Sequence, residues 1–316
     1  MSSADIREIV LDAADTVRLA GMSFAGAEPR AGSVLVVHGM AEHFGRYRAF
    51  AQFLADKGFT VYGFDLRGHG RTAENSRSGG LCPWTEFWQR SLNDIGLWID
   101  FIQSENPGRP LFLLGHSLGS FLARAWAPSS GGRLAGLILS GTGSIPRFWG
   151  SLLACAAKIE HEVNGHKEPG TLMHRVVFRF FARSVSPRRT RFDWLTRDDK
   201  IINAYRDDPL CGGRLPAGFY HDFLVNVQVL RKSSFLRKIP RELPVYLFSG
   251  SNDPVGNFSR GVMEVYREYQ KAGVMNISVK IYSGGRHEML NETNRDEVYR
   301  DIFAWMNPRA AIGQAG

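Results

Sequence analysis

Leu-Phe-Leu-Leu-Gly-His-Ser-Leu-Gly-Ser, residues 111–120, is the stretch from which the fold can be predicted. It begins with a short apolar run, which predicts a buried strand. Gly115 to Gly119 then match the pattern Gly-x-Ser-x-Gly, and a helix-compatible sequence follows through Trp126. A strand, a strained turn and a helix in this order predict a nucleophile elbow that exposes the hydroxyl of Ser117 above a parallel sheet. The alternative is an ordinary strand-to-helix turn whose serine only caps the helix.

Runs of apolar residues on both sides of this stretch predict a parallel sheet. Strands alternate with amphipathic helices, which implies right-handed crossovers and an α/β fold with a doubly wound sheet. An antiparallel hairpin is expected over residues 6–25. The expected parallel strands are 33–37, 60–65, 111–114, 134–140, 245–249 and 277–282, and the expected helices are 47–57, 85–103, 258–271 and 294–305.

The alternation breaks between residues 141 and 243, where helical patterns and prolines replace strand-like runs. The strand pattern resumes at Pro244, so we predict one α/β core formed by residues 1–140 and 244–316. Residues 141–243, called the insertion below, are predicted to be a helical cap. A separate domain joined by linkers is the less favoured alternative.

Composition limits the classes of protein that remain. The chain has 316 residues and 44% hydrophobic residues, enough for one large domain with an insertion. Three scattered cysteines (Cys82, Cys155 and Cys211) disfavour a disulfide framework or a zinc site and favour a reducing compartment. We see no signal peptide, and no uncharged apolar run approaches the roughly 18–20 residues of a membrane span. A cytoplasmic location is therefore expected.

The net charge of +8 is compatible with anionic surfaces or acidic substrates. Residues 171–192 are rich in arginine and contain no acidic residue. Arg175, Arg179 and Arg183 are four residues apart, so a helix would place them on one face. Such a basic amphipathic helix can lie on an anionic membrane. The favoured alternative is a cap helix with its apolar side over the active site and its arginines in water. No nucleic-acid partner is expected.

A serine nucleophile needs a base, and the base needs an orienting acid. In an α/β sheet of this type the chain order is serine, acid, histidine, and each lies after a strand. Asp253 follows the strand at 245–249, and His287 follows the last strand. Asp253 could instead be a structural aspartate in a turn before a proline, and His287 could instead be a solvated histidine in a loop. Asp198 and Asp199 are rival acids, but both lie in the insertion.

An oxyanion hole needs two N–H donors. One is expected from the backbone of Leu118, directly after the nucleophile. The other is expected from the backbone of Met40, in the loop that follows the strand at 33–37.

These motifs together resemble α/β-hydrolases of the monoacylglycerol lipase and lysophospholipase group, which are often classed as serine aminopeptidase-like. The matching segments are His38-Gly39-Met40-Ala41-Glu42-His43 with Arg46-Tyr47, Asp65-Leu66-Arg67-Gly68-His69-Gly70, residues 115–119, Gly250-Ser251-Asn252-Asp253-Pro254-Val255 and His287-Glu288. The resemblance implies Ser117 as nucleophile, Asp253 and His287 as its partners, and Met40 and Leu118 as oxyanion donors. It implies no metal and no organic cofactor.

The expected activity is hydrolysis of a carboxylic ester, with a small-molecule ester of a lipid or other apolar acyl group as substrate. Cleavage of a peptide or amide is the alternative within enzymes, and it would need a carboxylate such as Glu160, Glu162 or Glu168 to hold a substrate amine. A non-catalytic binding protein on the same fold is the alternative from another class. Aromatic residues of the insertion are expected to wall an apolar acyl pocket, unless they form a core of their own. Acyl length, head group and oligomeric state stay open.

Overall fold

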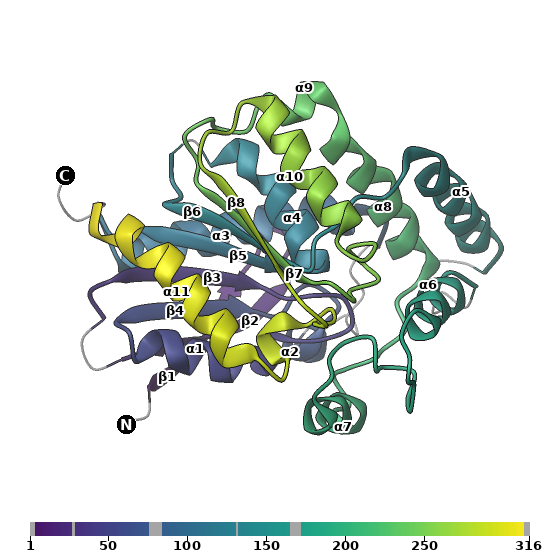
Figure 1. Ribbon diagram of the computed structural model, residues 1–316, viewed down its shortest axis with the longest axis horizontal. Helices are drawn as coiled ribbons and strands as arrows, with labels where there is room; N and C mark the ends of the chain where they lie inside the picture. The colour runs from purple at the N-terminus through teal and green to yellow at the C-terminus, as the bar shows by residue number, and fades with distance from the viewer. Residues whose placement is uncertain (1–3, 27–28, 76–83, 131, 165–171, 313–316) are drawn as a thin grey trace.

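The computed structural model describes residues 4–26, 29–75, 84–130, 132–164 and 172–312 (Figure 1). Cys82 and Glu168, named above, and the first residue of the arginine-rich stretch lie outside this part of the chain. The described residues form an eight-stranded sheet of order β1-β2-β4-β3-β5-β6-β7-β8. The first two strands pair antiparallel, β2 pairs antiparallel with β4, and every later pair is parallel.

The strands lie where the apolar runs predict them. Their bounds are β1 Asp5–Asp12, β2 Arg18–Ala25, β3 Gly32–Val37, β4 Phe59–Phe64, β5 Leu111–His116, β6 Gly136–Ser140, β7 Val245–Gly250 and β8 Ile277–Tyr282. The central strand β3 is buried throughout, and successive side chains face opposite cores. Leu35 and Val37 belong to one hydrophobic cluster, whereas Val34 and Val36 belong to the other. Burial on both faces explains why this strand has a continuous apolar sequence.

Helices cover both faces of the sheet, as a doubly wound fold requires. One face is covered by α3 (Phe87–Glu105), α4 (Leu118–Trp126) and α10 (Arg260–Ala272), and the other by α1 (Arg48–Ala55) and α11 (Arg295–Ile312). The short elements of the core are η1 Phe44–Tyr47, α2 Gly70–Asn75, η2 Trp84–Glu86, η3 Ala127–Ser129 and η5 Met289–Asn291. The prediction of a doubly wound, mostly parallel sheet with helices on both faces is confirmed.

Two helix boundaries differ from the expectation. The helix expected over residues 47–57 is shorter, because Tyr47 ends the 3₁₀ turn η1 with non-helical dihedral angles and the chain leaves α1 at Asp56. Gly58, with φ +85°, then turns the chain into β4. At the other end of the chain, α11 continues past Trp305 and through Pro308.

Between β6 and β7 the described residues form helices and no strand. These are α5 Arg147–Asn164, α6 Leu172–Arg183, α7 Asp199–Asp207, α8 Ala217–Val227, η4 Gln228–Arg231 and α9 Ser233–Leu236. In Figure 1, α5, α6 and α7 lie together at one side of the molecule, beyond the ends of the strands. The arginine-rich stretch therefore contains the predicted helix. Within the described residues, no helix has the length and apolar character needed to cross a membrane.

Candidate active site

Ser117 lies in the turn between β5 and α4, in backbone geometry that few residues adopt. Its φ is +51° and its ψ is −118°. A Cβ on Gly119 would lie 2.0 Å from the carbonyl oxygen of Val37, and one on Gly115 would lie 2.3 Å from the carbonyl oxygen of Gly119. Both glycines are therefore required, because helix and strand approach too closely for any side chain. The Ser117 side chain makes no capping hydrogen bond to α4, which disfavours a purely capping role.

His287 and Asp253, which the sequence places after neighbouring strands, are in direct contact. His287 Nδ1 lies 3.0 Å from Asp253 Oδ1. The same carboxylate accepts hydrogen bonds from the Ser249 hydroxyl at 2.9 Å and from the Val255 backbone N–H at 2.9 Å. Both members of the pair are buried, with exposed fractions of 2% for His287 and 0% for Asp253.

Burial and pairing act in opposite directions on this pair. Burial alone would raise the pKa of Asp253, but the charge of His287 and the hydrogen bonds to the carboxylate outweigh it and lower that pKa. Burial alone would lower the pKa of His287, but attraction to Asp253 outweighs it and raises that pKa. The pair therefore favours an imidazole that accepts a proton readily on Nε2.

The loop after β3 brings the predicted oxyanion donor Met40 to the serine. A Cβ on Gly39 would lie 3.1 Å from the Cβ of Ser117, so the loop passes directly beside this serine. Leu118 is the first residue of α4, where a backbone N–H has no partner within the helix. Met40, Ser117, Leu118 and His287 all line one cavity.

A buried ionic network joins this loop to the loop of the histidine. Glu42 accepts hydrogen bonds from the Gly39 backbone N–H at 2.6 Å and from the Tyr47 hydroxyl at 2.8 Å. Arg46 donates to Glu42 at 2.5 Å and binds both carboxylate oxygens of Glu288 at 2.6 and 2.7 Å. Paired carboxylates are needed here because an unpaired buried guanidinium would be strongly destabilising. In the sequence these residues stand in separate motifs, and their spacing does not predict this connection.

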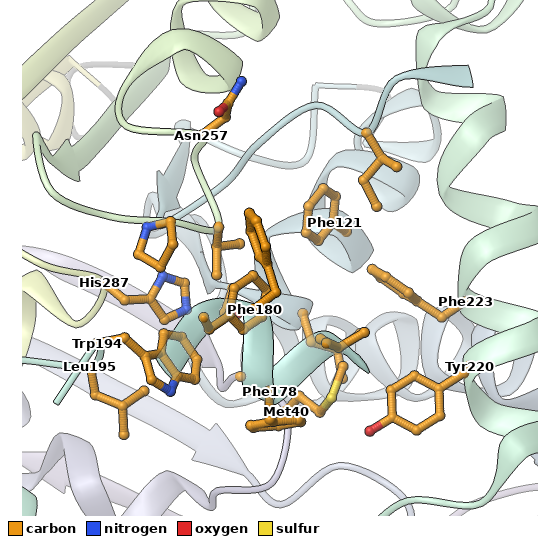
Figure 2. A pocket seen from close by; sticks show the side chains of 18 of the residues that line it. Met40, Phe121, Phe178, Phe180, Trp194, Leu195, Tyr220, Phe223, Asn257 and His287 are labelled. Atoms are coloured by element: carbon orange, nitrogen blue, oxygen red, sulfur yellow. The ribbon is translucent and has the colours of Figure 1, made fainter. Parts of the chain in front are cut away.

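The cavity beside Ser117 has a volume of about 710 Å³, within the range of small-molecule sites (Figure 2). Its wall is mostly apolar. Eight aromatic residues of the insertion contribute to it: Trp149, Phe178, Phe180, Phe181, Trp194, Tyr205, Tyr220 and Phe223. Phe219 instead packs on Phe87 in the core, and Phe148 is exposed. The expectation that aromatic residues of the insertion wall the cavity thus agrees with its lining. In Figure 2, Trp194 lies beside His287, whereas Phe223 and Tyr220 lie on the opposite side.

The rival residues have other partners. Asp198 caps α7 through the N–H groups of Lys200 and Ile201 and binds Arg295. Glu160 accepts the N–H groups of Leu172 and Met173 at the start of α6. None of these carboxylates lines the cavity.

Among the described residues, one group of side chains has the composition of a metal site. His43 Nε2, a carboxylate oxygen of Asp208 and the Cys211 sulfur lie within 4.8 Å of one another. His43 Nε2 and Asp208 Oδ2 are already joined at 2.9 Å. This group does not line the cavity and lies outside the predicted catalytic set.

The fold and this arrangement define a hydrolase of the α/β-hydrolase class. A family model described as "Serine aminopeptidase, S33" matches residues 28–294, which is most of the chain. The chain belongs to this family, and the predicted resemblance is confirmed.

Curated relatives are similar over most of their length. A monoacylglycerol lipase of Mycolicibacterium smegmatis is 27% identical over 285 residues, covering 88% of this chain and 89% of the relative. The monoglyceride lipase of Homo sapiens is 27% identical over 288 residues, covering 88% of this chain and 83% of the relative.

Solved structures agree with the fold. A thermostable carboxyl esterase from Bacillus coagulans superposes with a TM-score of 0.86 at 27% identity, over 96% of this chain and 99% of the esterase. A monoglyceride lipase of Saccharomyces cerevisiae superposes with a TM-score of 0.76 over 98% of this chain and 96% of the lipase; at 21% identity it supports the fold alone.

Proposed function

We propose that the chain is a serine hydrolase of carboxylic esters, with monoacylglycerol- or lysophospholipid-type lipid esters as its substrate class. One observation carries the proposal: an apolar cavity of about 710 Å³ is lined by both Ser117 and His287, and His287 is hydrogen-bonded to a buried Asp253. The names of the relatives support an ester substrate of lipid type. No cofactor enters the mechanism.

The chemistry follows from the positions of these groups. His287 Nε2 accepts the proton of the Ser117 hydroxyl as the oxygen attacks the acyl carbonyl. Asp253 holds the imidazole in the required tautomer and stabilises the imidazolium. The backbone N–H groups of Met40 and Leu118 bind the developing oxyanion. The imidazolium then protonates the leaving alcohol, and water hydrolyses the acyl-enzyme by the same sequence of steps.

Amide or peptide cleavage is the less favoured activity of this site. The described lining residues include two carboxylates, Glu42 and Glu288, and both are paired with Arg46. Neither is available to hold a substrate ammonium group. Of the carboxylates considered from the sequence, Glu160 is used at the start of α6, and Glu162 lies near Lys158.

We also propose that the insertion, residues 141–243, acts as a cap that contacts anionic membrane surfaces. Arg175, Arg179 and Arg183 of α6 are exposed. Apolar side chains of α5 and α6 are exposed as well: Phe148, Trp149, Leu152, Ile159, Val163, Leu172, Val176 and Phe180. Three of them, Trp149, Val176 and Phe180, also line the cavity. Exposed apolar and basic side chains together match a membrane interface. A cytoplasmic location and the cap boundaries remain predictions from the sequence.

The experiment that tests the catalytic assignment is active-site labelling. A fluorophosphonate probe should label Ser117, and peptide mapping should find the adduct there rather than at Ser120 or Ser140. Ser117→Ala should lose labelling and ester turnover while keeping the wild-type melting temperature. A Ser117→Ala protein with more than a few per cent of wild-type turnover would refute the assignment, and an unlabelled, inactive wild type would favour a binding protein.

A further inference from the structure

A short segment of the insertion, Asp193–Arg197, is bound along the loop that carries His287. The backbone N–H of His287 donates to the carbonyl of Trp194 at 3.3 Å, and that of Glu288 donates to the carbonyl of Leu195 at 2.7 Å. The Arg286 guanidinium donates to the carbonyls of Asp193 at 2.5 Å and Thr196 at 3.0 Å. The segment and the loop are about ninety residues apart in the chain, so the insertion holds the histidine loop by tertiary contacts.

A buried carboxylate joins the C-terminal end of this segment to the histidine loop. Glu292 is fully buried and accepts hydrogen bonds from the backbone N–H groups of Arg197 at 3.1 Å and Arg286 at 3.0 Å. The Arg197 side chain binds its other oxygen at 3.0 Å. The position of the segment 193–197 is therefore determined on both sides of Trp194.

This arrangement places the Trp194 indole against the His287 imidazole. The ring centroids are 5.1 Å apart and the ring planes are inclined by 34° (Figure 2). Two phenylalanines of α6 pack against the indole, with ring-centroid distances of 4.8 Å for Phe181 and 6.1 Å for Phe178. Helix α6 therefore holds the tryptophan in place. Trp194 is 5% exposed.

The other groups that face His287 determine what the indole can add. Asp253, on the loop after β7, is the directly paired anion. His116, at the end of β5, has its ring 4.7 Å away, and burial lowers its pKa to about 4, so it stays neutral. Glu42 and Glu288 also attract a positive imidazole, and the single Arg46 guanidinium that they share offsets only part of their charge. The face of an indole attracts a cation without adding a net charge.

We propose that Trp194 is a positioning residue for the reaction, whose indole face orients the His287 ring and stabilises the imidazolium formed when the Ser117 proton moves to Nε2. The proposal rests on the proposed function. In the acylation step the proton leaves the Ser117 oxygen and is held on His287 Nε2. It then passes to the oxygen of the departing alcohol. The insertion then contributes to catalysis itself as well as to substrate binding.

The alternative is that Trp194 only fills space. Its indole N–H is buried without a hydrogen-bond partner among the described residues. An unpaired buried donor is destabilising, so a phenylalanine would fill the same space at lower cost. Trp194→Phe keeps an aromatic face and removes the N–H, whereas Trp194→Leu removes the face.

The test compares Trp194→Leu, Trp194→Phe and a matched control, Phe192→Leu. Phe192 is buried in the same aromatic cluster as Trp194 but does not line the cavity. Each protein is assayed for kcat, KM and the rate of fluorophosphonate labelling of Ser117 across pH, with the melting temperature measured in parallel. Labelling reports on His287 without requiring the natural substrate.

We expect Trp194→Leu to lower kcat and the labelling rate by roughly 3- to 30-fold and to move the midpoint of the pH profile down by about half a pH unit to one unit. Trp194→Phe should retain most of both properties, and Phe192→Leu should leave the midpoint unchanged. The proposal is overturned if Trp194→Leu keeps the wild-type midpoint, if Phe192→Leu moves the midpoint equally, or if Trp194→Phe is as impaired as Trp194→Leu. Absence of labelling in the wild type would instead refute the proposed function.

Discussion

Acyl-chain length is the property of this enzyme that its cavity predicts most directly. The test uses a series of p-nitrophenyl esters whose acyl groups run from acetyl to octanoyl. The cavity wall is mostly apolar, and its volume of about 710 Å³ leaves room for a medium-length chain beside Ser117. Each methylene moved from water into such a wall contributes about 0.8 kcal/mol at most.

Going from acetyl to octanoyl adds about six methylenes, which gives an upper limit of about 5 kcal/mol, or roughly a thousandfold or more in kcat/KM. Some of this gain is lost because flexible chains must be ordered on binding. We therefore expect kcat/KM to rise by one to three orders of magnitude, as a rough range, before it levels off where the chain fills the cavity.

The assay measures p-nitrophenol release below the micellar concentration of each ester, with Ser117→Ala as the blank. Aminoacyl-anilides are measured beside the esters and should be poor substrates, because the carboxylates of the cavity are paired with Arg46. A value of kcat/KM that falls steadily from acetyl to octanoyl would show that the aromatic residues do not bind an acyl chain. That result would refute the lipid-ester reasoning while leaving the serine hydrolase intact.

Three further outcomes follow from the site. The value of kcat/KM should rise with pH, because His287 must be neutral to act as the base. The midpoint should lie above 6.5, because Asp253 raises the pKa of His287. Asp253→Asn should lower the rate by about 10⁴-fold when ester hydrolysis is measured across pH. Gly119→Ala should lower the melting temperature and the labelling rate, since its Cβ would lie 2.0 Å from a backbone oxygen, whereas Gly213→Ala, which meets nothing within 4 Å, should change neither. A chelator should leave ester turnover unchanged; a loss of activity that zinc restores would instead assign a role to the group of His43, Asp208 and Cys211.

Much of the core could be predicted because its signals are local. A strand buried on both faces is mostly apolar, as residues 34–37 of β3 and 111–114 of β5 are. The turn at Ser117 requires glycine at positions 115 and 119, because a side chain at either position would clash with the backbone. The shape of the turn can therefore be predicted from the motif itself. The contact between Asp253 and His287 could be anticipated because parallel strands end at the same edge of the sheet. Helix ends were less predictable, as α1 shows, because tertiary contacts decide where the last turn stops.

The connections between these parts depend on contacts that sequence spacing does not encode. Glu42 and Glu288 are 246 residues apart, and they meet only because Arg46 lies between the loops after β3 and β8. Trp194 could be recognised as an aromatic residue of the insertion, but its contact with His287 depends on how Glu292 and Arg286 hold the segment 193–197. Because Trp194 lies against the His287 ring and also lines the cavity, it joins the acyl-binding part of the insertion to the environment of the histidine. Exchanging the insertion for that of a relative should therefore change the pH profile together with the acyl preference, and a chimera that changed only the acyl preference would contradict this coupling.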